Sequence, residues 1–286
     1  MTSAARAERA ALALAWALLV AAGCRDAAPA DRERGPGDDA PAAAPTAGVA
    51  PTITDDRDAA LRALTEDPPA ADLVALAARL GRVADPEAAR ARTDPPVARA
   101  VGDVERFQVH DIVNNRELDI EARLEVATDN AWFWVQAGQS FDRAQLERGA
   151  EAFSGEVYPR LRQVFGGEWS PGVDNDPRVH VLHHEPVPGI AGYFSGADEV
   201  TKAVDPDSNA LEMFYINLSV YAPGTADYLG LLAHEFQHMI HWHRDYGEPT
   251  WVNEGLSEVA PHLVGYPAQF GQAYRRSPDT PLTDWD

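Results

Sequence analysis

Hydrophobic and polar residues alternate from Val104 to Val135, a period typical of half-buried β-strands. The alternating positions are Phe107, Val109, Asp111 and Val113 in a first run, then Leu118, Ile120, Ala122, Leu124 and Val126 in a second. Between the runs, Asn114-Asn115 suits a hairpin turn, and a third apolar run follows at residues 132–135. The pattern therefore predicts three consecutive strands.

After these strands, apolar residues recur at the spacing of an α-helix. This spacing predicts a helix from Asp142 to Phe165, broken near Gly155 and Pro159, because glycine and proline interrupt helices. A short strand is then expected at residues 179–183, followed by further strands and two helices. This order predicts an α+β fold.

The first residues are typical of an export signal. Residues 1–23 carry two arginines and then an apolar run too short for a confident membrane span. The run ends in Leu19-Val20-Ala21-Ala22-Gly23-Cys24, which resembles the lipobox of bacterial lipoproteins. The sequence thus predicts a lipid anchor at Cys24 and display on the cell envelope. An ordinary secretory signal with an incidental cysteine is the alternative.

Three further regions follow the predicted anchor. Residues 24–54 are rich in Ala, Pro and Asp, and we expect a disordered tether. Residues 55–100 are predicted as a helical region, a hairpin over 55–92 that would serve as a propeptide or a docking element. Residues 101–286 form the expected main domain.

Composition narrows the classes of function. The chain of 286 residues has 24 basic and 45 acidic residues, a formal charge of −21, and Lys202 is its one lysine. A nucleic-acid binder needs clustered basic residues, so that class is excluded. The single cysteine, Cys24, excludes an internal disulfide framework and a cysteine-based zinc site.

The sequence His234-Glu235-Phe236-Gln237-His238 is the strongest chemical signal. Histidines four positions apart on a helix lie on one face and can bind a single metal ion. Glu235, next to His234, can then take a proton from a water without binding the ion itself. Thr225 or Asp227 is the expected start of this helix, and Gly247 its end.

A third metal ligand is predicted at Glu254. It lies 16 positions beyond His238, in a second helical stretch for which Asn253 is the expected N-cap. Two histidines and one glutamate leave a fourth tetrahedral position open, as in catalytic zinc sites. Glu258, one turn later, is expected to accept the other ring N–H of His234, and Asn253 is also expected to support the metal ligands.

The two halves, HExxH at 234–238 and NExxSE at 253–258, resemble the gluzincin or thermolysin-like zinc peptidases. More narrowly they are similar to the hyicolysin-type secreted metallopeptidases, as are Ala191–Ser195 and Glu212–Asn217. The resemblance implies a zincin-like domain with a mixed β-sheet and a zinc cofactor. The metzincin pattern is excluded, since it requires Gly at 241 and His at 244, where the chain has His241 and Arg244.

The expected activity is endopeptidase cleavage. Zinc would polarise a water, and Glu235 would pass its proton to the leaving amine. The peptide substrate would lie as an extended strand along residues 192–195 or 213–218. Candidate donors to the oxyanion are Tyr246, His262, Tyr266 and Tyr274.

Two alternatives stay open. The loop Asp174-Asn175-Asp176-Pro177 could bind calcium through its carboxylates or be an ordinary turn. Only 28 residues follow Glu258, so the helical lobe that gluzincins carry there is expected to be short or missing. This favours, as a second hypothesis, a lipid-anchored binding or scaffold protein with a non-catalytic zinc site.

Overall fold

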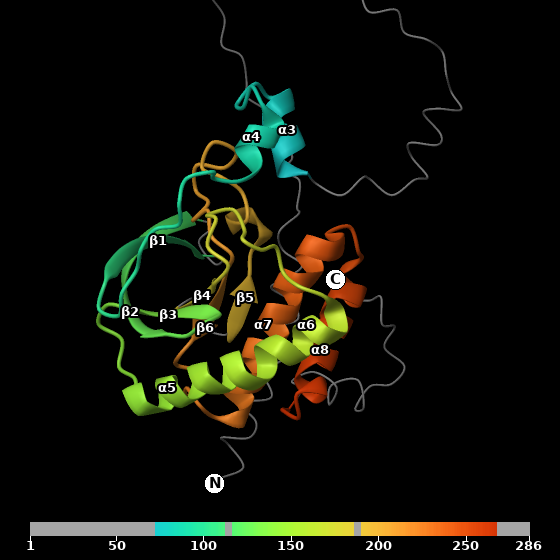
Figure 1. The fold of residues 1–286 in the computed structure, drawn as a ribbon. Helices are drawn as coiled ribbons and strands as arrows, with labels where there is room; N and C mark the ends of the chain where they lie inside the picture. Colours follow the sequence, from blue (N-terminus) through green and yellow to red (C-terminus); the bar gives the residue numbers. More distant parts are fainter. Residues whose placement is uncertain (1–71, 112–115, 186–189, 268–286) are drawn as a thin grey trace, which may run out of the picture. The chain divides into compact units, whose positions relative to one another are not determined.

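The computed structural model describes residues 72–111, 116–185 and 190–267 (Figure 1). The predicted signal, Cys24, the tether, the Asn114-Asn115 turn and Tyr274 lie outside these residues. The strands are β1 (Val104–Asp111), β2 (Arg116–Ala127), β3 (Ala131–Gln136), β4 (Val179–His184), β5 (Gly192–Phe194) and β6 (Met213–Asn217). The helices are α3 (Leu73–Arg79), α4 (Pro86–Arg90), α5 (Arg143–Ala152), α6 (Tyr158–Phe165), α7 (Ala226–Asp245) and α8 (Thr250–Leu263). The predicted α+β class is confirmed.

All six described strands form one mixed sheet, in the order β1-β2-β3-β4-β6-β5. Strands β1 to β3 pair antiparallel, β3, β4 and β6 pair parallel, and β5 pairs antiparallel with β6. Every residue of β4 and β6 is buried, as expected for parallel strands covered on both faces. Among the described strands, β5 has β6 as its sole neighbour, so β5 is an edge of the sheet.

The two faces of the sheet pack against different partners. On one face, Phe133, Val181 and Phe214 join a core with buried residues of α5, α6 and α7. On the other face, Trp134 packs with Phe107 of β1 and with further residues of β2, because the sheet curls (Figure 1). The parallel strands are therefore covered on both faces, and α7 packs against one of these faces.

The helix predicted from Asp142 to Phe165 does not break at Gly155 and Pro159. Asp142 caps its start by accepting the N–H of Gln145 at 3.1 Å. The chain then passes through a π-helical turn, Phe153–Val157, into α6. Pro159 falls in the first turn of α6, where its missing N–H is tolerated. The helix continues because the wider π-helical turn accommodates Gly155 and leads directly into α6.

The second of the two C-terminal helices begins earlier than predicted. Helix α7 starts after Thr225, whose side chain accepts the N–H of Tyr228 at 3.3 Å, as expected. Helix α8 starts at Thr250 after Pro249, so Asn253 is not its N-cap. Proline fixes φ near the helical value, which favours this earlier start. Asn253 is thereby placed inside the helix, on its first turn.

The predicted helical region at 55–100 is seen in part. Asp72 and Asp85 cap α3 and α4, and residues 91–100 contain no helix. Val74 and Ala77 of α3 and Ala89 of α4 belong to a small apolar cluster that also includes Val200. Within the described residues, no helix is long and apolar enough to cross a membrane.

Candidate metal centre

His234 and His238 lie one turn apart on α7, with both rings turned to the same side. Their ring centroids are 4.7 Å apart, and the two Nε2 atoms are 3.0 Å apart. The side chain of His234 is 2% exposed. Local helix geometry alone brings these two nitrogens together.

Glu254 reaches the same point from α8. Its Oε2 lies 3.5 Å from His234 Nε2 and 3.6 Å from His238 Nε2. A tetrahedral ion with bonds of about 2.0–2.1 Å holds its ligand atoms about 3.3 Å apart. The three observed separations of 3.0, 3.5 and 3.6 Å bracket that value. The group His234, His238 and Glu254, called here the metal group, can therefore hold a metal ion.

Residues of α8 also fix the orientation of the two rings. His238 Nδ1 lies 2.9 Å from Asn253 Oδ1 and 3.0 Å from Ser257 Oγ. His234 Nδ1 lies 3.2 Å from Glu258 Oε1. With both Nδ1 atoms engaged, the Nε2 lone pairs are directed to the centre, an arrangement that supports metal binding. The sequence assigned no role to Ser257, which also donates a hydrogen bond to Gln237.

The electrostatics of the group suit a cation. Burial lowers the pKa of His238 to about 4, and the charge of His234 acts in the same direction. Burial alone would also lower the pKa of His234, but hydrogen bonds to Glu254 and Glu258 outweigh it and raise that pKa to about 10. A proton on His234 thus neutralises the carboxylates beside it. A metal ion would displace that proton and take over its role.

Glu235 lies beside the metal group, against the edge strand. Its side chain is 1% exposed, and its Oε1 has no hydrogen-bond partner in the described chain. Burial raises the pKa of Glu235 to about 8. A β-carbon added at Gly192 of β5 would lie 3.2 Å from Oε1. Glycine at 192 therefore lets the edge strand approach the carboxylate closely.

The predicted oxyanion donors are placed apart from the metal group. Tyr246 is 49% exposed at the end of α7, where its ring packs on Trp242 at 5.6 Å. Tyr266 donates a hydrogen bond to Glu156 Oε2 at 3.0 Å, and His262 is exposed near the end of α8. No hydrogen bond or ion pair among the described residues joins these three to the metal group, and their role as oxyanion donors stays a prediction.

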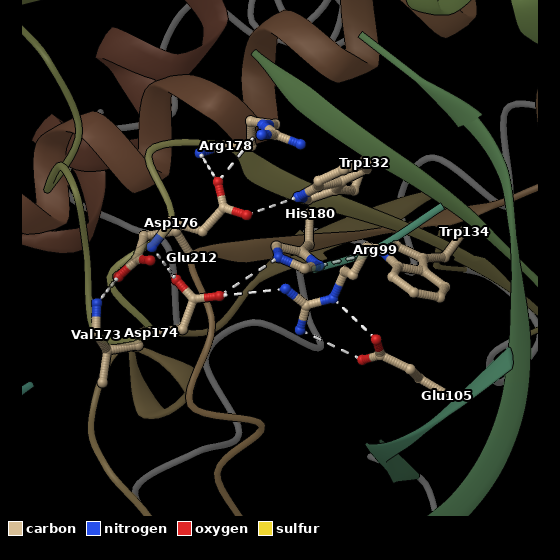
Figure 2. A network of polar contacts seen from close by, with 10 residues as sticks. All are labelled: Arg99, Glu105, Trp132, Trp134, Val173, Asp174, Asp176, Arg178, His180 and Glu212. Atoms are coloured by element: carbon tan, nitrogen blue, oxygen red, sulfur yellow. Dashed lines mark hydrogen bonds and ion pairs between the residues drawn. The ribbon is translucent and has the colours of Figure 1, made fainter. Parts of the chain in front are cut away.

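The acidic loop at 174–177 is built as a protein ion-pair network (Figure 2). Asp174 accepts the N–H of Asp176 at 3.0 Å and faces Arg99 Nη1 at 3.6 Å. Asp176 accepts the indole N–H of Trp132 at 3.2 Å. Arg99, whose side chain is 4% exposed, also pairs with Glu105 at 2.8 Å. A guanidinium thus supplies the positive charge that calcium would bring, and the loop is a structural turn.

No known protein-family model matches the chain, and no curated protein is significantly similar to it. What the molecule can do is therefore argued from the metal group and its surroundings.

Proposed function

We propose that this protein is a zinc-dependent endopeptidase with a zincin-like fold. The observation that carries the proposal is the triangle of His234 Nε2, His238 Nε2 and Glu254 Oε2, with separations of 3.0 to 3.6 Å. Nitrogen, nitrogen and oxygen ligands in tetrahedral spacing suit zinc. Three protein ligands leave one position for water, as catalytic rather than structural sites do.

Zinc bound there would supply a Lewis acid that lowers the pKa of a water to about 7 and polarises a carbonyl. Glu235 is the proton carrier. Its carboxylate has no competing hydrogen bond, so it can accept a proton from the attacking water and donate it to the leaving amine. Its burial excludes bulk water from that transfer.

The substrate would bind along β5. This strand ends the described sheet, and its Gly192 lies against Glu235. An extended peptide added to this edge gains main-chain hydrogen bonds and passes beside the carboxylate. The second expected docking segment, 213–218, is excluded, because β6 lies between β4 and β5 and its five residues are buried.

Replacing Glu235 with Gln tests the mechanism. We expect Glu235→Gln to retain one zinc per chain and to lose casein cleavage by at least about 100-fold, the contribution typical of a general base. Glu147→Gln, a change on the exposed face of α5, serves as the matched control. It should leave the zinc content and the casein cleavage unchanged. Retained cleavage in Glu235→Gln overturns the mechanism. Bound zinc without cleavage in the wild type supports a binding or scaffold protein instead.

We further propose that Cys24 carries a lipid that anchors the exported protein to the cell envelope, in keeping with the lipobox-like residues before it. Expression of the full chain in a bacterial host should place the wild type in the membrane fraction. Cys24→Ala should release it in soluble form, and an equal distribution of the two proteins counts against the anchor.

A further inference from the structure

A cavity of about 340 Å³ lies between the start of α3 and the last turns of α7. Its walls include three aromatic side chains, Trp169, Trp242 and Tyr246, and two carboxylates, those of Glu199 and Asp72. Asp72 and Arg90 also line it and pair with each other at 3.6 Å. The cavity contains none of the three residues of the metal group, and the sequence patterns did not predict it.

Glu199 is an unusual residue to find in its wall. It is 5% exposed, and its Oε1 has no hydrogen-bond partner in the described chain. The charges that act on it, Asp198 and Glu168, are acidic. Arg90 is already engaged by Asp72 and by Glu87 at 3.2 Å. Burying a carboxylate without a partner is costly, so this group lacks a positive counterpart that the described chain does not provide.

We propose that the cavity binds a basic side chain of the peptide substrate, a guanidinium or an ammonium, with Glu199 as its counter-ion. The aromatic rings around the carboxylate would attract the same cation through their faces, as Trp and Tyr do. A carboxylate among the aromatic side chains that line a pocket selects a positively charged group over an apolar one. This inference rests on the proposed peptidase function, since it names the substrate class of that site.

The cavity lies where a peptide on β5 would reach it. Trp242 follows His238 by one helical turn, and its ring is 6.3 Å from that of Phe194 in β5. A β-carbon at Gly196, just beyond β5, would lie 2.3 Å from the Trp242 ring, so the chain passes directly against it.

The distance along the helix gives the position of the basic residue. Trp242 lies seven positions after Glu235 on α7, which is about 10 Å at about 1.5 Å per residue. An extended peptide covers that length in about three residues. The site therefore prefers Arg or Lys about three residues from the cleaved bond.

The binding test needs no catalysis. Nα-acetyl-arginine methylamide and its uncharged isostere, the citrulline derivative, are titrated into the wild-type protein by calorimetry. We expect the arginine compound to bind at least about tenfold more tightly, as charge-assisted hydrogen bonds imply. Glu199→Gln should abolish the difference, and Glu147→Gln should preserve it. Because glutamine has nearly the shape of glutamate and brings no charge to be buried, the variant should fold.

The cleavage test uses paired peptides that carry Arg or citrulline three residues from the cleaved bond. We expect a kcat/KM ratio of at least about ten in the wild type and about one in Glu199→Gln. Trp169→Leu, which removes one aromatic ring from the cavity, should lower the affinity for the arginine compound. This variant tests the inference if Glu199→Gln misfolds. Equal binding of both compounds by the wild type, or a preference that survives Glu199→Gln, overturns the inference. Absence of cleavage with selective binding overturns only the peptidase function.

Discussion

Gly192 faces Glu235 across a gap that leaves no room for a side chain. A β-carbon there would lie 3.2 Å from Glu235 Oε1 and 2.7 Å from the backbone oxygen of Tyr215. Gly192→Ala should therefore push β5 away from the sheet and the carboxylate. We expect a loss of about 1–3 kcal/mol in unfolding free energy, as for overpacking, and a fall in casein cleavage with zinc content unchanged.

Gly155→Ala is the control for that variant. A β-carbon at Gly155 meets nothing within 4 Å, and its φ is not positive. The change should leave cleavage unchanged and not destabilise the protein, since alanine favours helix over glycine. Equal effects of the two substitutions on cleavage would show that close approach at Gly192 is unimportant.

Asn253→Ala should weaken metal binding. Its Oδ1 lies 2.9 Å from His238 Nδ1 and holds the ring with Nε2 toward the metal group. Loss of such a ring-orienting partner costs about 10–100-fold in metal affinity, which competition with a zinc chelator measures. Asn130→Ala, which removes a side-chain hydrogen bond to Ser154, should leave the affinity unchanged.

Arg99→Met should destabilise the fold far more than Arg143→Met. The side chain of Arg99 is 4% exposed and pairs with Glu105 and Asp174, so its loss leaves the buried carboxylate of Asp174 and the half-buried one of Glu105 uncompensated. We expect a cost of about 3–5 kcal/mol in urea unfolding. Arg143 is 51% exposed and pairs with Glu125 and Glu147, for which about 0–1 kcal/mol is expected. Similar costs for both would contradict a buried network.

Glu199→Gln should stabilise the protein increasingly as pH rises. Burial raises the pKa of Glu199 to about 8, above its ordinary value of 4.5. Between these two values the unfolded chain loses a proton that the folded one keeps, so wild-type stability falls with rising pH. Glutamine does not titrate. The difference in melting temperature between variant and wild type should therefore grow from pH 5 to pH 9, and a constant difference would contradict the shift.

The local parts of the site could be predicted from sequence. His234 and His238 converge because they lie one helical turn apart, and Glu254 was recognisable from the two-part motif. Asn253 was expected both to support the metal ligands and to cap α8. As an expected N-cap it would have served the backbone, whereas the earlier start of α8 turns its side chain to His238.

Long-range features could not be predicted. The insertion of β6 between β4 and β5 is a matter of topology that the alternation of residues does not encode. The cavity beside Trp242 brings together residues from five separate segments of the chain. The π-helical turn at 153–157 arises because Phe153 and Val157 are both buried, a tertiary effect that overrides the local signals for a break.

Half of the buried residues of α8 are polar. Glu254 and Ser257 are among its four buried residues, with Ala260 and Pro261, while Leu256 and Val259 are exposed. Hydrophobic packing therefore contributes little to the association of α8 with α7. Coordination of one metal ion by Glu254 and the two histidines would contribute a large part of it. Chelation should let α8 open locally while the sheet stays folded. The metal would then stabilise the packing of α8 on α7 in addition to its role in catalysis. In the metal-free protein, proteases should cleave at α8 before they cleave elsewhere.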